Sequence, residues 1–260
     1  MPPTIEDNVS CFGKEYSWPD EGNEWSVPWG GTPYLWYGTI FPRIFPFLPA
    51  TNILEIAPGF GRCTQYLLGL CTRLQIIDLN SNCIDHCRNR FRDFTNIEYY
   101  VNDGKHLDGI SDNSVDFVFS WDSLVHCESD VLESYINECS RILKPDGIGF
   151  FHHSNLGQYF DASRKCLSCE NLHGRAESVS ASSFKKFCDD HGLVCVNQEI
   201  INWRGDIRND CLSLFIKTGE NNRYKHNLFV NNEFHREILH VRDIANMYDF
   251  RRSHYEQVIM

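Results

Sequence analysis

The spacing of apolar and polar residues predicts alternating strands and helices from about residue 51 to residue 217. The first apolar run, Asn52–Ile56, leads into a turn that contains two glycines, and Cys63–Leu68 then has helical spacing. A second apolar run, Leu74–Leu79, follows that short helix and ends beside an acidic residue. A strand, a glycine turn, a helix and a second strand form a βαβ unit, in which both strands lie parallel in one sheet.

The same alternation continues to the end of this region, and the last two strands are joined by a turn. Two consecutive strands with a short connection form an antiparallel hairpin. We therefore predict an α/β fold with a Rossmann-like, seven-stranded, mostly parallel sheet, helices on both faces and a C-terminal antiparallel hairpin. The later elements that carry this prediction are strands over 96–101, 115–122, 147–153, 193–203 and 210–217, and helices over 81–94, 130–143 and 180–191.

The composition divides the chain into three parts. Residues 1–50 are rich in proline, glycine and aromatic residues, so we expect a packed arm, and its Trp29-Gly30-Gly31 segment could place backbone next to a ligand. This arm could cover the edge of the sheet, close over a ligand, or do both. Residues 51–218 form the predicted ligand-binding domain, and residues 219–260 are a C-terminal extension in which 233–250 could be one helix.

The glycine turn has a recognisable motif. It reads Glu55-Ile-Ala57-Pro-Gly59-Phe-Gly61, which resembles motif I of class I S-adenosylmethionine-dependent methyltransferases, usually written E-x-G-x-G-x-G. Ala57 stands where the family has its first glycine, while the two glycines nearest the helix are retained. The resemblance covers roughly residues 29–217, and it implies that the chain binds S-adenosylmethionine at the carboxyl ends of the strands.

The resemblance also implies a role for each acidic residue near these strand ends. Asp78 is placed to bind the ribose hydroxyls, Asp103 to bind the adenine amino group, and Glu55 to lie near the methionine end or to order the turn. The full set of cofactor-binding residues that we predict is Trp29, Gly30, Glu55, Ala57, Gly59, Gly61, Asp78, Leu79, Asp103, Gly104, Ser120 and Trp121.

The end of the fourth strand, at 120–126, is the predicted reaction centre. It lacks the Asn/Asp-Pro-Pro-Tyr motif of methyltransferases that act on amino groups of DNA or protein glutamine. It contains Asp122 and His126 instead, and a neutral histidine can remove the proton of an alcohol near pH 7. We predict His126 as the general base, with Asp122 beside it.

The fifth strand ends in His152-His153-Ser-Asn155, and only one of two adjacent histidines can face a given cleft. We name His153 as the third catalytic candidate. Asp122 with His152 or His153 could hold a divalent ion such as Mg²⁺. Alternatively, Asp122, one of these histidines and Asn155 could contact substrate hydroxyls directly. The following segment, up to the Arg175-Ala-Glu-Ser-Val-Ser phrase, resembles methyltransferases of saccharides and small sugars.

The expected function is methyl transfer from S-adenosylmethionine to a hydroxyl of a sugar or another small polar acceptor. The alternatives are a small-molecule N-methyltransferase and a catalytically silent methyltransferase fold that acts as a binding subunit. The retained Asp78, Asp103 and turn glycines favour cofactor binding over a silent role.

The charge and composition of the chain limit the kinds of partner that it is expected to bind. The net charge is −11 and no basic stripe is present, which argues against a nucleic-acid partner. The chain has no apolar run of the ~20 residues that a membrane span needs and no secretory signal at its start, so we expect a cytoplasmic protein that binds a small molecule or a saccharide and could form homo-oligomers. Cys166 and Cys169 have the spacing of a metal-binding pair, but no second pair follows.

Overall fold

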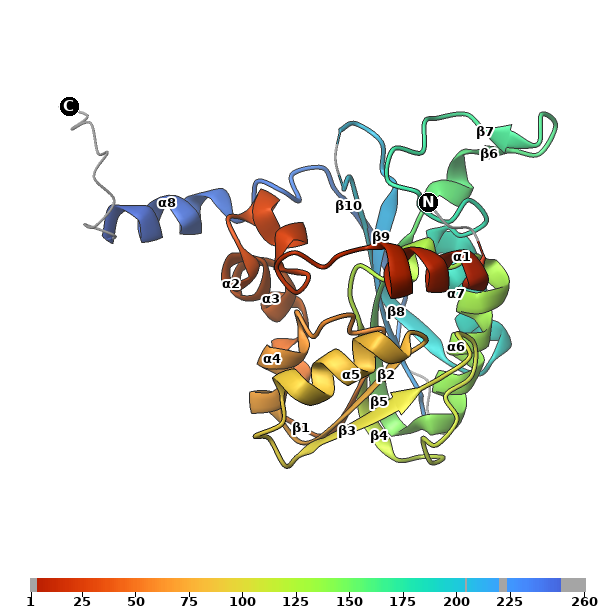
Figure 1. The fold of residues 1–260 in the computed structure, drawn as a ribbon. Coiled ribbons are helices and arrows are strands. Elements are labelled where there is room, and N and C mark those ends of the chain that lie inside the picture. The colour runs from red at the N-terminus through yellow and green to blue at the C-terminus, as the bar shows by residue number, and fades with distance from the viewer. Residues whose placement is uncertain (1–3, 204, 220–223, 249–260) are drawn as a thin grey trace.

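A computed structural model describes residues 4–203, 205–219 and 224–248. Its centre is an eight-stranded sheet with the strand order β3-β2-β1-β4-β5-β9-β8-β10, and Figure 1 shows its arrangement. The strands are β1 (Ala50–Ile56), β2 (Cys71–Asp78), β3 (Ile97–Val101), β4 (Val115–Ser120), β5 (Leu143–Ser154), β8 (Val194–Ile201), β9 (Asp210–Ile216) and β10 (Asn227–Asn231). The predicted Rossmann-like fold is thus confirmed.

The sheet is parallel except at one strand. β9 runs antiparallel to both β5 and β8, so β8 and β9 form the predicted hairpin. The sheet has one strand more than predicted, because β10, from the C-terminal extension, pairs parallel with β8. A separate two-stranded hairpin, β6 (Phe160–Asp161) and β7 (Cys166–Leu167), lies in the loop after β5.

Helices cover both faces of the sheet, because successive residues of the buried strands point to opposite sides. In β1, Ile53 belongs to one apolar cluster and Leu54 to the other. The first cluster holds residues of the arm, α4 and α5, and the second holds residues of α6 and α7. The helices are α1 (Ile5–Ser10), α2 (Thr32–Leu35), α3 (Phe41–Ile44), α4 (Thr64–Leu67), α5 (Ser81–Arg90), α6 (Ser129–Ile142), α7 (Ala181–Asp190) and α8 (Leu239–Tyr248).

The aromatic arm has two parts. The part from α2 to α3 packs into the core, where Trp36, Ile40 and Ile44 are almost fully buried. The part before it, residues 4–25, includes α1 and leads across the sheet, and it is drawn in red in Figure 1. The arm therefore both packs against the sheet and extends toward the carboxyl ends of the strands.

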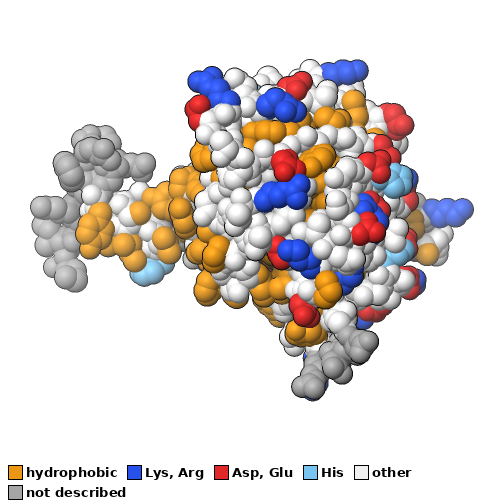
Figure 2. Space-filling view, turned by 90° about the horizontal axis from the view of Figure 1, so that it is seen from below, with side chains coloured by type: hydrophobic (Ala, Val, Ile, Leu, Met, Phe, Trp, Pro, Cys, Tyr) orange, Lys and Arg blue, Asp and Glu red, His pale blue; other side chains and the backbone are white. Residues whose placement is uncertain are grey.

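The segment before α8 contacts the core, and α8 itself lies outside it. Phe234 and Ile238 are buried in the first apolar cluster, whereas α8 has no buried residue and projects from the body in Figure 1. Acidic and basic side chains are interspersed on the face that Figure 2 shows. Among the described residues, no helix is both long and apolar enough to cross a membrane.

Candidate cofactor and acceptor site

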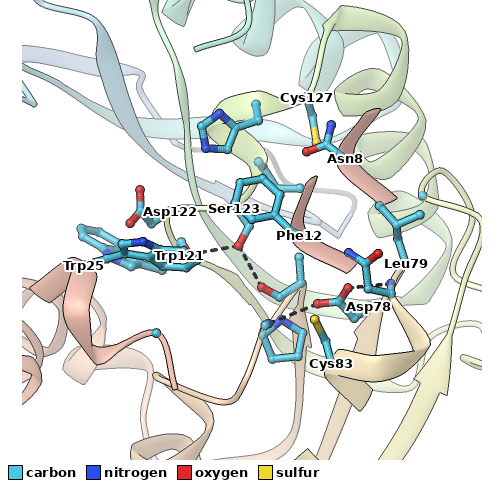
Figure 3. A pocket seen from close by; sticks show the side chains of 18 of the residues that line it. Asn8, Phe12, Trp25, Asp78, Leu79, Cys83, Trp121, Asp122, Ser123 and Cys127 are labelled. Atoms are coloured by element: carbon cyan, nitrogen blue, oxygen red, sulfur yellow. Dashed lines mark hydrogen bonds between the residues drawn. The ribbon is translucent and has the colours of Figure 1, made fainter. Parts of the chain in front are cut away.

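A cavity of about 360 Å³ lies at the carboxyl ends of β1, β2 and β4. Its size is within the range of small-molecule sites. The strand order reverses between β1 and β4, and the crevice at such a reversal is the usual ligand site of open α/β sheets. Figure 3 shows Asp78, Leu79 and Cys83 toward one end of the cavity and Trp25, Trp121 and Asp122 at the other.

Asp78, the last residue of β2, presents a fixed carboxylate to the cavity. The backbone N–H of Gly59 donates to its Oδ2 at 3.1 Å, and the backbone N–H of Asn80 donates to its Oδ1 at 2.8 Å. Burial raises the pKa of Asp78 to about 6, although these backbone hydrogen bonds lower it. Each carboxylate oxygen has a second lone pair, so the carboxylate can still accept hydrogen bonds from a ribose diol.

The turn after β1 depends on left-handed backbone conformations. Ala57, Gly59 and Gly61 have φ values of 56°, 56° and 88°. A Cβ at Gly61 would lie 2.5 Å from the ring of Phe91, so a side chain has no room there. Ala57 adopts a left-handed conformation that glycine accepts without strain, at a cost of roughly 1–2 kcal/mol. The turn is therefore left-handed at all three positions despite the alanine.

Glu55 is buried inside the turn and also lines the cavity. Burial raises its pKa to about 8, and this outweighs the opposing effect of Thr64, whose hydroxyl donates to the carboxylate at 2.5 Å. Glu55 is therefore largely protonated near pH 7. It can order the turn through Thr64 and offer a hydrogen bond to a ligand.

The first part of the arm covers the cavity, and it does so with residues that the sequence did not single out. Phe12, Trp18 and Trp25 line the cavity, and the Trp18 ring stacks on Phe60 with centroids 4.5 Å apart. Ile5 lies against Gly104, within 3.4 Å of the position of a Cβ there. The composition of the arm allowed a cover over a ligand as one of two compatible roles, but the sequence alone did not show which of its aromatic residues would line the cavity.

Trp29 and Gly30 lie outside the lining, contrary to the expectation. The Trp29 ring is buried against Trp203, with centroids 5.1 Å apart, and a Cβ at Gly30 would meet Arg242. Both residues serve the packing of the arm and the C-terminal segment.

Three other predicted contacts, Gly61, Asp103 and Ser120, also fall outside the lining. The Asp103 carboxylate accepts hydrogen bonds from the backbone N–H groups of Lys105 and His106, each at 2.8 Å, and from the His106 ring. Partial burial would raise its pKa, but these hydrogen bonds lower it to about 2. Ser120 is buried, and its hydroxyl donates to the carbonyl oxygen of Ile56. The predicted residues that do line the cavity are Glu55, Ala57, Gly59, Asp78, Leu79, Gly104, Trp121, Asp122 and His126.

Asp122 lies at the end of the cavity opposite Asp78, held between two arginines. Its Oδ2 is 3.1 Å from a guanidinium nitrogen of Arg62, and its Oδ1 is 3.6 Å from one of Arg175. Its φ of 59° is left-handed, a conformation that aspartate tolerates better than most residues. Arg175 also forms a two-point ion pair with the buried Asp210 and lies over the ring of Trp203. The sequence did not identify Arg62 as the partner of Asp122 or Asp210 as the partner of Arg175, because both ion pairs join residues far apart in the chain.

His126 lines the cavity beside Asp122 in a defined tautomer. Its Nδ1 is 2.8 Å from the carbonyl oxygen of Gly174, which can only accept, so the neutral ring carries its proton on Nδ1 and keeps a lone pair on Nε2. Burial, and next the charge of Arg175, lower the pKa of His126 to about 4. The ring of Phe12, from the arm, lies with its centroid 5.8 Å away.

The adjacent histidines of β5 face opposite sides of the sheet, as predicted, but the catalytic candidate faces away from the cavity. His153 stacks on Phe184 of α7 with ring centroids 4.2 Å apart, and its Nε2 is 2.8 Å from the hydroxyl of Ser213. His152 lies between Trp121 and Trp203, which line the cavity, and its Nε2 is 2.9 Å from Asp210. His153 is thus a core residue, and His152 acts at most through its neighbours.

The predicted magnesium site does not fit these residues. The Asp122 carboxylate is already neutralised by Arg62 and Arg175, and two guanidinium groups repel a divalent ion. The Nε2 atom of His152 is engaged by Asp210, and His153 faces the other side of the sheet. No group of three potential metal ligands occurs within residues 4–203, 205–219 and 224–248, which include Cys166 and Cys169.

Comparisons with known proteins agree with this geometry. Residues 53–147 match the family described as "Methyltransferase domain". No curated protein matches the sequence. A SAM-dependent methyltransferase from Methanosarcina mazei is 18% identical with a TM-score of 0.55, over 70% of this chain and 100% of that chain. One from Mesorhizobium loti is 15% identical with a TM-score of 0.53, over 68% of this chain and 96% of that chain.

These two likenesses show the fold alone, since both identities are low. Motif I, the strand order and the family match over residues 53–147 all agree with the Rossmann-like fold of class I S-adenosylmethionine-dependent methyltransferases. The cavity residues fit that cofactor, because Asp78 offers a fixed carboxylate beside a glycine turn. The opposite end, with Trp25, Asp122 and His126, is the candidate acceptor end.

Proposed function

We propose that this protein transfers a methyl group from S-adenosylmethionine to a hydroxyl of a sugar or another small polar acceptor, with His126 as the general base. The observation that carries the proposal is the fixed tautomer of His126, whose Nε2 lone pair is left for a proton while Nδ1 is held by Gly174. S-adenosylmethionine supplies a methyl group bound to a sulfonium, so the acceptor needs alignment and the loss of one proton. That proton passes to Nε2, and the methyl group replaces it on the acceptor oxygen.

The shape and charge of the acceptor end support a neutral polar acceptor. Its aromatic side chains, Trp25, Trp121 and Trp203, offer flat apolar faces, as the faces of a sugar ring require. Its charged groups are largely paired with each other, as in the ion pair of Arg62 with Asp122. A neutral acceptor adds hydrogen bonds to such a site without leaving a buried charge unpaired.

A test of this function measures S-adenosylhomocysteine released from S-adenosylmethionine with a panel of acceptors. The panel contains methyl glycosides of neutral hexoses, simple diols and small amines such as sarcosine. We expect turnover with a hydroxyl acceptor and its loss in His126→Ala. Turnover with amines alone would favour the N-methyltransferase alternative, and cofactor binding without turnover of any acceptor would favour a silent binding subunit.

A further inference from the structure

Glu24, on the arm, has a carboxylate that the fold holds in place, but only one of its two oxygens has a hydrogen-bond partner among the described residues. The residue lines the cavity, and its Oε1 accepts a hydrogen bond from the hydroxyl of Tyr16 at 2.8 Å. Its Oε2 is buried and has no hydrogen-bond partner among the described residues. Burying a carboxylate oxygen without a donor costs about 1–3 kcal/mol, so such an atom calls for an explanation.

The neighbouring side chains hold this carboxylate in place. Burial, and next the hydrogen bond to Glu24, raise the pKa of Tyr16 to about 12, so the phenol remains a donor at all ordinary pH values. The Tyr16 ring in turn packs on Trp18 and Trp25, with centroids 5.4 and 5.2 Å away. Glu24 is therefore carried by a rigid aromatic cluster of the arm.

Arg62, the cation of this region, does not donate a hydrogen bond to Oε2 of Glu24. The guanidinium of Arg62 lies over the ring of Trp25, 5.5 Å from its centroid, and its closest carboxylate is that of Asp122 at 3.1 Å. Another of its nitrogens is 3.4 Å from the hydroxyl of Ser26. Arg62 thus adds positive potential near Glu24 without a direct ion pair to it, which disfavours an ammonium group as the missing donor.

We infer that Glu24 is a specificity-determining residue of the acceptor site, whose Oε2 accepts a hydrogen bond from an acceptor hydroxyl that lies against Trp25. The class of acceptor rests on the proposed function, while the assignment of Glu24 rests on its own geometry. The arm then has two roles, since the segment that covers the cofactor also supplies part of the acceptor site. The acceptor site is complete only when residues 4–25 are in place.

The first experiment compares Glu24→Gln and Glu24→Ala with Asp20→Asn, which removes an exposed carboxylate of the same arm and serves as the matched control. With methyl glycosides as probes, we expect the Glu24 variants to raise KM about 10- to 100-fold, the loss of one hydrogen bond to a charged group. We expect kcat and the affinity for S-adenosylhomocysteine to change less than about threefold. An unchanged KM in both Glu24 variants overturns the inference.

A second measurement needs no acceptor. If Glu24 serves a ligand, Glu24→Gln should keep or raise Tm in the ligand-free protein, because it removes the charge of a carboxylate that has one buried oxygen without a donor among the described residues. If Glu24 holds the arm together instead, Tm should fall by several degrees and affinity for S-adenosylhomocysteine should drop as well, and that result overturns the inference. Failure of every glycoside as a substrate would count against the proposed acceptor class, while the Tm result still decides the role of Glu24.

Discussion

The Nδ1 atom of His126 lies 2.8 Å from the carbonyl oxygen of Gly174, so a loop after β5 sets the tautomer of a histidine after β4. This contact joins two segments that lie far apart in sequence. Burial of the ring, and next the charge of Arg175, lower the pKa of His126 to about 4, although the hydrogen bond to Gly174 acts in the opposite direction. A base with this pKa is weak but stays neutral over the whole physiological pH range.

The first prediction concerns this base. His126→Ala should lower kcat by about 10²- to 10⁴-fold, the usual contribution of a general base, and leave the affinity for S-adenosylhomocysteine nearly unchanged. In the intact enzyme, the protonation of His126 should not change kcat above about pH 5, and kcat should fall as the ring is protonated near pH 4. A pH–rate profile with circular dichroism at each pH checks this. An acidic limb near pH 6.5 would instead indicate an ordinary, solvated histidine.

The second prediction concerns Asp78. Its pKa of about 6 in the ligand-free protein means that a large fraction of the carboxyl is protonated at pH 5, and the ribose diol binds the ionised form best. Affinity for S-adenosylhomocysteine should therefore rise with pH up to about 6–7 and fall by about tenfold per unit below pH 6. Asp78→Asn should weaken binding by roughly 1.5–3 kcal/mol and remove this slope. Calorimetry from pH 5 to pH 8 measures both, and an equal slope in the variant would assign it to another group.

The third prediction separates the two parts of the arm. Trp18 stacks on Phe60 over the cavity, whereas Tyr37 is 62% exposed in the part that packs on the sheet. Trp18→Ala should weaken S-adenosylhomocysteine binding by about tenfold, since it opens the cover, and Tyr37→Ala should leave it unchanged. Equal effects of the two substitutions would contradict a cover made by residues 4–25.

The fourth prediction concerns metal. Because Arg62 and Arg175 neutralise Asp122, chelation with EDTA should leave turnover unchanged, and added Mg²⁺ should not raise it. The measurement is initial rate after dialysis against chelator. A rate that drops and is restored by Mg²⁺ would require an ion held by residues other than these.

The fifth prediction concerns the altered motif. Ala57→Gly relieves a left-handed alanine, worth roughly 1–2 kcal/mol, and loses roughly 0.5–1 kcal/mol because glycine has more freedom in the unfolded chain. The free energy of unfolding in urea should rise by up to about 1.5 kcal/mol. Ala181→Gly, at the start of α7 and without a left-handed φ, is the control and should destabilise the protein. A loss of stability in Ala57→Gly would show that the methyl group of Ala57 contributes packing that outweighs the strain.

The sequence by itself determined the Rossmann-like fold and placed the motif I turn and Asp78 at the cavity. Apolar periodicity places the strands, and the residues of the motif I turn and of Asp78 follow directly from where β1 and β2 end. These features are local, because a strand end and the turn after it are continuous in the chain. The extra strand β10 was not predicted, since an exposed edge strand needs little apolar pattern.

Only the tertiary structure decided how the acceptor end is built. Its residues come from the arm, the turn after β4, the loop after β5 and the strand β9, and their pairing depends on how these segments pack. The direction of His153 was set by the alternation of side chains along β5, in which a shift of one residue exchanges the two faces. Sequence alone names Asp122 and His126 as candidates, but the partners that fix their charge and tautomer, Arg62, Arg175 and Gly174, are brought to them by the fold.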